Sequence, residues 1–226
     1  MKRNLAQPSS QRREFLGKLI AGAAALGFTS LVSPLQTKAA AISEGSSEAD
    51  QWFNKIKGKH RIVFDATNHH DSFPLAWSRV FLSTNNDTGT PDSDLGVVVI
   101  LRHDAIPMAM EDSLWAKYKF GEVFKIQDGG TKTASLRNMY WNPKQGELHF
   151  PDMSIDQLQK RGAMFCVCDM ALTVYSTIIG KNMNLAPADV KKEWLKGILP
   201  GIQVVPSGVW AVSRAQEKGC AYCFAG

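Results

Sequence analysis

The feature that most constrains the fold is a nearly continuous apolar run, LGVVVILR, at residues 95–102. A run without polar alternation is typical of a strand buried on both faces, as in parallel sheets. A second run lies at residues 60–67, shorter ones lie at 163–168 and 202–205, and residues 221–224 suit an edge strand. Because helix-length patterns separate the runs, the sequence predicts an α/β domain with a mostly parallel sheet and helices on both faces.

The helix-length patterns are punctuated by proline and glycine, which favour helix starts and ends. The predicted helices are 74–83, 111–119, 154–161, 170–179, 188–196 and 209–218. Residues 120–152 fit no period, so we expect a long insertion or lid there. An aromatic set is expected to pack this insertion, and its members are Trp115, Tyr118, Phe120, Phe124, Tyr140 and Trp141.

The N-terminal 41 residues have the order of a secretory signal: basic residues, an uncharged stretch and then Ala39-Ala40-Ala41. Around Arg12-Arg13 the sequence resembles the twin-arginine export signal, although Gln11 and Gly17 depart from it and leave Sec export open. We therefore expect a signal peptide at 1–41, a leader and short helix at 42–58, and a single domain at 59–226 that works in the periplasm or otherwise outside the cytoplasm.

The net charge argues against nucleic acid as a partner. The chain has 26 basic and 21 acidic residues, a formal net charge of +5. Residues 1–41 contain six of the basic residues and one acidic residue, so the remainder is formally neutral. The basic character belongs to the targeting segment and not to the domain.

Reactive side chains follow the predicted strands at their carboxyl ends, where open α/β sheets bind ligands. These residues are Asp65, His69, Arg102, His103, Cys166, Cys168, Ser207 and Gly208. One edge of the sheet would then hold a thiol, imidazoles, a guanidinium and a helix start. Such a combination favours binding of an anion or a sulfur species.

The cysteines and histidines are each open to more than one interpretation. Cys168, beside Arg102 and a helix start, is either a reactive thiol or a small buried residue. Cys166 should point to the same face of the strand as Cys168, where it is a metal ligand, a resolving thiol or a residue of the core. His103 is preferred to His69 because it directly follows the most strand-like run, although it would equally suit a loop imidazole bonded to Asp104. No cysteine spacing matches a structural zinc module.

Asp65 could orient an imidazole or cap the following turn. Cys220 and Cys223 form Cys-Ala-Tyr-Cys, with no histidine following for haem attachment. In a strand they would point to opposite faces, which disfavours local pairing.

Residues 61–224 resemble the DsrE/DsrF-like family of sulfur-relay proteins. The matching parts are the strand with Asp65, VVVILRHDAIPMAM at 97–110, RGAMFCVCDMAL at 161–172 and PSGVWAVSRAQEKGCAY at 206–222. The resemblance implies a flavodoxin-like or Rossmann-like sheet, homo-oligomers, and persulfide on Cys168, which occupies the place of the family's sulfur-carrying cysteine.

Two functions are therefore expected. In the first, a sulfurtransferase or sulfur carrier, Cys168 takes sulfane sulfur and passes it to an acceptor thiol, such as one on a partner protein. Arg102 and His103 stabilise the thiolate, and Asp65, His69, Cys166, Ser207 and Gly208 complete the site. The alternative is a non-catalytic periplasmic module that binds a small anion or a transition metal. The sequence names no cofactor.

Overall fold

A five-stranded parallel sheet forms the centre of the computed structural model, which describes residues 47–226. The strands are β1 (His60–Ala66), β2 (Leu95–Leu101), β3 (Met164–Cys168), β4 (Ile202–Val205) and β5 (Ala221–Phe224). All five predicted strands are confirmed, with Thr67, Arg102 and Ala163 lying just outside them. The α/β fold with a flavodoxin-like or Rossmann-like arrangement is thereby confirmed. The predicted signal peptide at 1–41 lies outside the described residues.

The helices follow the predicted patterns to within a few residues. They are α3 (Glu48–Phe53), α4 (Phe73–Asp87), α5 (Asp112–Tyr118), α6 (Phe120–Val123), α7 (Ile155–Lys160), α8 (Asp169–Asn182), α9 (Pro187–Lys196) and α10 (Gly208–Glu217). Short 3-10 turns are η2 (His70–Ser72), η3 (Asp92–Asp94), η4 (His103–Ala109) and η5 (Pro151–Met153). The helix α3 provides the short helix expected within 42–58.

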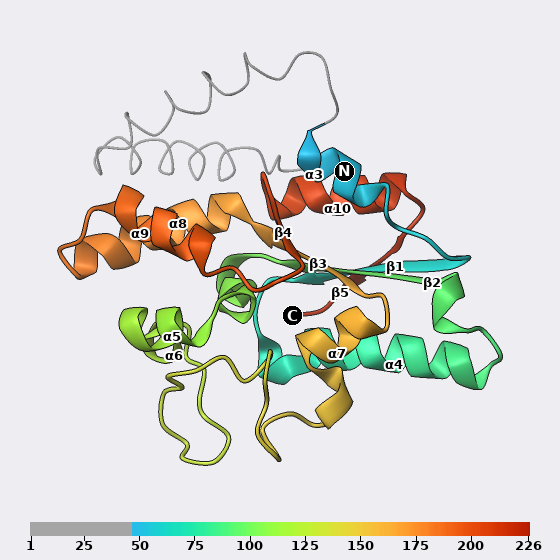
Figure 1. Cartoon of the computed structure of the whole chain (residues 1–226), viewed down its shortest axis with the longest axis horizontal. Helices are drawn as coiled ribbons and strands as arrows, with labels where there is room; N and C mark the ends of the chain where they lie inside the picture. Colours follow the sequence, from blue (N-terminus) through green and yellow to red (C-terminus); the bar gives the residue numbers. More distant parts are fainter. Residues whose placement is uncertain (1–46) are drawn as a thin grey trace, which may run out of the picture. The chain divides into compact units, whose positions relative to one another are not determined.

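Both faces of the sheet are covered, as the run in β2 predicted. All seven residues of β2 are buried. Val97, Val99 and Leu101 belong to one hydrophobic cluster, whereas Val98 and Ile100 pack with residues of α3 and α10 in a second. Figure 1 shows α4 and α7 on one side of the sheet and α3 and α10 on the other. Each fully buried aliphatic side chain contributes about 1.5–3 kcal/mol, so this strand anchors both layers.

The strand order is β4-β3-β2-β1-β5. From β1 to β4 the chain advances across the sheet in one direction, and α10 then returns it to the opposite side of β1, where β5 pairs. Right-handed crossovers place a reversing helix on the other face from the advancing ones. The first turn of α10 consequently lies at the carboxyl ends of the central strands.

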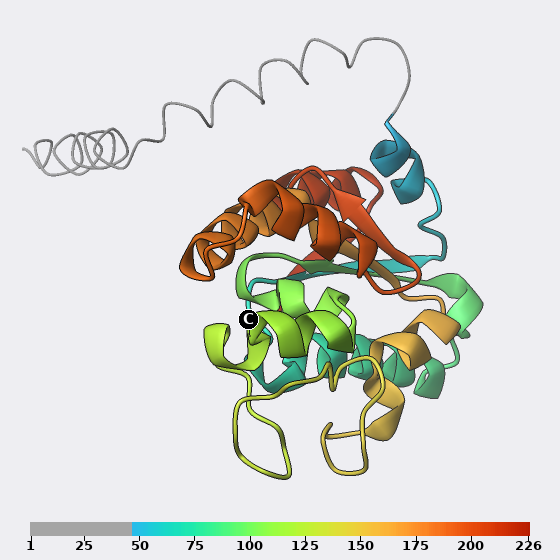
Figure 2. The ribbon, with the colours of Figure 1, turned by 60° about the vertical axis from the view of Figure 1, so that its left-hand side comes forward.

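The predicted insertion contains α6 and otherwise few regular elements until η5. Figure 2 shows its loops on the same side of the sheet as α4 and α7. Buried Asn138 fixes it to η4, because its Nδ2 donates to the carbonyl oxygens of Met108 and Met110 at 2.9 and 2.8 Å. The predicted aromatic packing is present: Phe120, for example, has its ring centroid 5.1 Å from that of Trp194.

Candidate functional site

Asp65 and Arg102 form a buried ion pair at the carboxyl edge of β1 and β2. The Arg102 Nε donates to Oδ1 at 2.6 Å and its Nη2 donates to Oδ2 at 2.8 Å. The Asp65 side chain is 3% exposed and that of Arg102 is 19% exposed. Tyr222, on β5, donates its hydroxyl to the same Oδ2 at 2.9 Å. Asp65 thus holds a guanidinium, and neither orients an imidazole nor caps a turn.

Cys168 lies at the end of β3 and caps α8. Its Sγ accepts a hydrogen bond from the backbone N–H of Ala171 at 3.3 Å. The hydrogen bonds to Asp65 raise the pKa of Arg102 above its usual value, and the negative charge that Cys168 can carry raises it further. Cys168 therefore lies at a helix N-terminus and close enough to Arg102 for the two charges to interact.

Gly208 allows Arg102 to lie against the first turn of α10. A Cβ on Gly208 would lie 2.4 Å from the Arg102 Cδ and 2.8 Å from its Cβ, which no side chain tolerates without displacement. The preceding Ser207 caps α10, because its Oγ accepts from the N–H of Trp210 at 3.2 Å. The structure thus brings Asp65, Arg102 and Gly208 together at the carboxyl edge of the sheet.

Cys166 lies in the core. It is fully buried and packs in the cluster that includes Val98 and Ile100. Burial raises its pKa well above the usual range of a thiol. Cys166 is therefore a neutral packing residue next to Cys168 and does not reach solvent. All four cysteines, Cys220 and Cys223 included, are free thiols.

The two predicted histidines do not join this group. His103 is exposed, begins η4 with a left-handed φ of 48°, and makes no hydrogen bond or ion pair with a described residue. His69 lies beyond the end of β1 and faces a different cavity. Neither contacts Cys168 through any interaction seen in residues 47–226.

The loop after β1 turns sharply through three consecutive left-handed residues. His70, Asp71 and Ser72 have φ angles of 39°, 48° and 72°, and none is glycine. Such conformations cost about 1–3 kcal/mol each and cluster at functional sites. The turn directs His69 away from Cys168 and toward the insertion.

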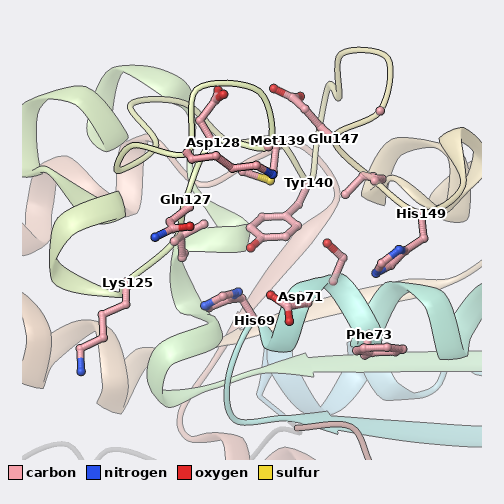
Figure 3. Close-up of a pocket in the computed structure, with 16 residues that line it drawn as sticks. His69, Asp71, Phe73, Lys125, Gln127, Asp128, Met139, Tyr140, Glu147 and His149 are labelled. Atoms are coloured by element: carbon pink, nitrogen blue, oxygen red, sulfur yellow. The ribbon is translucent and has the colours of Figure 1, made fainter.

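A cavity of about 520 Å³ lies between this loop and the insertion. Figure 3 shows His69, Asp71 and Phe73 on one side and Gln127, Tyr140 and His149 from the insertion around them. The remaining lining residues are Ser72, Lys125, Ile126, Asp128, Gly129, Lys132, Met139, Gly146, Glu147 and Leu148. Sequence reasoning did not find this cavity, because the insertion has no periodicity that would place its side chains.

Two groups that line this cavity, the half-buried His69 and the buried Tyr140, have shifted pKa values. Burial lowers the pKa of His69, against the opposing effects of Asp71 and Asp104. Its Nδ1 is buried and has no hydrogen-bond partner among the described residues. Burial likewise raises the pKa of Tyr140. Both side chains are consequently neutral near pH 7.

Comparisons with known proteins add little to this geometry. No family model and no curated protein matches the chain. A solved structure of a protein of unknown function from Methanobacterium thermoautotrophicum is 16% identical, covers 74% of this chain and 99% of that chain, and has a TM-score of 0.40. The resemblance to DsrE/DsrF-like proteins therefore stays a prediction.

Within residues 47–226, no group of three or more His, Cys, Asp or Glu side chains is arranged to hold a metal ion. No helix in that part of the chain is long and apolar enough to cross a membrane.

Proposed function

We propose that Cys168 accepts sulfane sulfur as a persulfide and passes it to an acceptor thiol. The observation that carries this proposal is the placement of Sγ, which accepts the Ala171 N–H at the start of α8 and lies within the electrostatic reach of Arg102. A nearby guanidinium and a helix N-terminus are the surroundings in which reactive cysteines are found, and both support the proposal. His103, which the sequence assigned to the same task, is exposed and makes no hydrogen bond or ion pair with a described residue.

The chemistry needs no external oxidant. The Cys168 thiolate attacks a sulfane sulfur of an inorganic polysulfide, forming a new S–S bond while the donor's S–S bond breaks. The electron pair leaves on the shortened polysulfide. An acceptor thiolate then attacks the outer sulfur of the persulfide, and the electron pair returns to Cys168.

Limited exposure restricts the donor. Cys168 is 6% exposed, so a small inorganic sulfur species reaches it more easily than a persulfide on another protein. Loading moves the reactive atom about 2 Å beyond Sγ, the length of an S–S bond. An acceptor thiol of a partner protein therefore has better access to the loaded sulfur than a protein donor has to the bare thiol.

Mass spectrometry of the intact protein after incubation with polysulfide tests the proposal. We expect the wild type to gain the mass of sulfur, the gain to vanish in Cys168→Ser, and a reductant to reverse it. Cys220→Ser is the matched control, because Cys220 is also a buried thiol but lies at the other end of the sheet, before β5. Loading that persists in Cys168→Ser, or a wild type that gains no sulfur, would contradict the proposal.

A binding module for a small anion is the second candidate. Arg102 uses Nε and Nη2 for Asp65, and no described residue accepts a hydrogen bond from its Nη1. That nitrogen supports anion binding at the same edge. Sulfate binding that is lost in Arg102→Gln, together with no sulfur loading, would favour this second function. Nothing in residues 47–226 favours the transition-metal version.

Export and assembly belong to the same proposal. A twin-arginine signal at 1–41 would deliver the folded domain to the periplasm, and Arg12→Lys with Arg13→Lys should abolish that export. Assembly into homo-oligomers is supported by three exposed apolar residues at four-residue spacing on α8, which are Met170, Val174 and Ile178. Light scattering of the mature protein tests assembly, and a monomer at all concentrations would contradict it.

A further inference from the structure

The cavity between the loop after β1 and the insertion contains polar groups that the Cys168 chemistry does not use. Its volume of about 520 Å³ falls within the range of about 300–1,000 Å³ that is typical of small-molecule sites. Of the eight non-glycine residues with left-handed φ in the described chain, Asp71, Ser72, Lys125 and Lys132 line this cavity. Strained backbone concentrated around one cavity indicates that the fold holds this cavity in one defined shape.

Asp71 is an exposed residue of the lining, and its carboxylate has no partner among the described residues. Its charge nevertheless acts on both His69 and Tyr140. The other two carboxylates of the lining have partners. Asp128 accepts from the N–H groups of its own turn, and Glu147 pairs with a nearby arginine.

Lys125 and Lys132 are the lysines of the lining. Figure 3 shows Lys125 extending away from the cavity centre, whereas Asp71 lies beside His69 and the Tyr140 hydroxyl is directed toward the same space. A second carboxylate, Asp104, also acts on His69. Two carboxylates next to His69, of which Asp71 is unpaired, therefore favour a cation on this side of the cavity.

The same space offers acceptors and aromatic surface. A neutral imidazole has one bare nitrogen, and His69 has a buried nitrogen without a partner. Buried polar atoms usually have a partner, so the hydrogen-bonding capacity of this imidazole is not filled by the protein itself. The ring of Phe73 lies 5.6 Å from that of His149 and forms an apolar wall. Aromatic faces also attract cations.

We propose that this cavity binds a small primary amine with a flat apolar body, whose ammonium group is held by Asp71 with His69 and Tyr140 as hydrogen-bonding partners. An ammonium group has three N–H donors and no acceptor. A carboxylate, an imidazole nitrogen and a phenol oxygen match those three donors. The body of the amine packs against Phe73. The site is separate from the Cys168 edge, and its occupant need not take part in sulfur chemistry.

Three probes of the same shape and different charge test the proposal. Isothermal titration of the full chain at neutral pH would use benzylammonium, benzyl alcohol and benzoate. We expect benzylammonium to bind with a Kd of about 1 mM or lower, the alcohol to bind at least about tenfold more weakly, and benzoate not to bind. Equal binding of amine and alcohol, a preference for benzoate, or no binding of the amine would each overturn the proposal.

Asp71→Asn is the decisive variant. Asparagine adopts left-handed backbone readily, so the loop with φ of 48° at this position is kept. We expect the affinity for benzylammonium to fall about tenfold or more, while that for benzyl alcohol stays unchanged.

Asp128→Asn is the matched control, because it makes the same change on the same lining and its amide oxygen can still accept from the turn. It should leave benzylammonium binding within about twofold. An equal loss in both variants, or no loss in Asp71→Asn, would overturn the assignment to Asp71. Unchanged binding in Cys168→Ser would confirm that the two sites are independent, whereas a loss there would overturn their separation.

Discussion

Replacing Asp65 by asparagine should destabilise the protein while making Cys168 more reactive. The substitution keeps the shape of the side chain but turns an amide toward one donor of Arg102, ending the bidentate pair of 2.6 and 2.8 Å. Removing one partner of a buried pair costs about 3–5 kcal/mol. Because the Arg102 side chain is 19% exposed and asparagine keeps one acceptor, we expect a loss of about 2–4 kcal/mol in the free energy of unfolding.

Urea denaturation measures this loss. With a denaturant slope of about 2 kcal/mol per molar, the midpoint should fall by about 1–2 M. The alkylation rate of Cys168 should rise several-fold, and its pH profile should move toward acid, because the charge of Arg102 is no longer neutralised.

Glu147→Gln is the matched control, since its pair with Arg137 has side-chain exposures of 21% and 6%, close to those of the Asp65 pair. It should lose similar stability without changing the alkylation profile. A loss below about 1 kcal/mol in Asp65→Asn would refute the view that Asp65 neutralises a buried charge. An unchanged alkylation profile would refute the action of Arg102 on the thiol.

Three further changes test other parts of the structure. Gly208→Ala should lower the free energy of unfolding by about 1–3 kcal/mol and slow alkylation of Cys168, because the new Cβ displaces Arg102. Gly129→Ala is the control: its Cβ would meet no atom closer than 3.5 Å, so its urea denaturation should be nearly unchanged. Burial lowers the pKa of His69, so the unfolded state binds the proton at a higher pH than the folded state does. The free energy of unfolding should therefore fall as the pH drops below about 6.5. His69→Gln should flatten that part of the stability curve, and an unchanged slope would contradict the burial effect. Asn138→Ala should cost about 2–4 kcal/mol and expose the insertion to limited proteolysis, and a proteolysis rate equal to that of the wild type would argue against its anchoring role.

The fold was predictable because the apolar runs and the prolines and glycines between them indicate the same strand and helix boundaries. Both bounds of the strands at 202–205 and 221–224 were correct from sequence alone. The apolar run in β2 predicted a strand covered on both faces, and a parallel sheet with helices on both sides is the common way to bury such a strand.

The candidate site was predictable in part. Asp65, Arg102 and Gly208 converge because carboxyl ends of parallel strands share one edge. Tyr222 was missed as a partner of Asp65, since nothing in one sequence shows which strand lies beside β1. His69 was misplaced because the turn that redirects it has left-handed residues without the glycines that usually mark them.

The cavity could not be predicted at all. Tyr140 and His149 come from an insertion that follows neither a helical nor a strand period. Their positions depend on side-chain contacts such as those of Asn138, whose Oδ1 accepts from the backbone N–H of Tyr140 at 2.9 Å. Contacts of that kind depend on the whole fold and leave no local pattern.

The pairing of β1 with β5 has a consequence for how the protein is made. The hydrogen bond between Asp65 and Tyr222 joins residues 157 positions apart, so one edge of β1 has no neighbour while most of the domain is being synthesised. At about 5–20 residues per second, this edge stays uncovered for many seconds. An unpaired strand edge is a template for aggregation. The nascent chain therefore presents chaperones with a binding surface that disappears when β5 adds to the sheet.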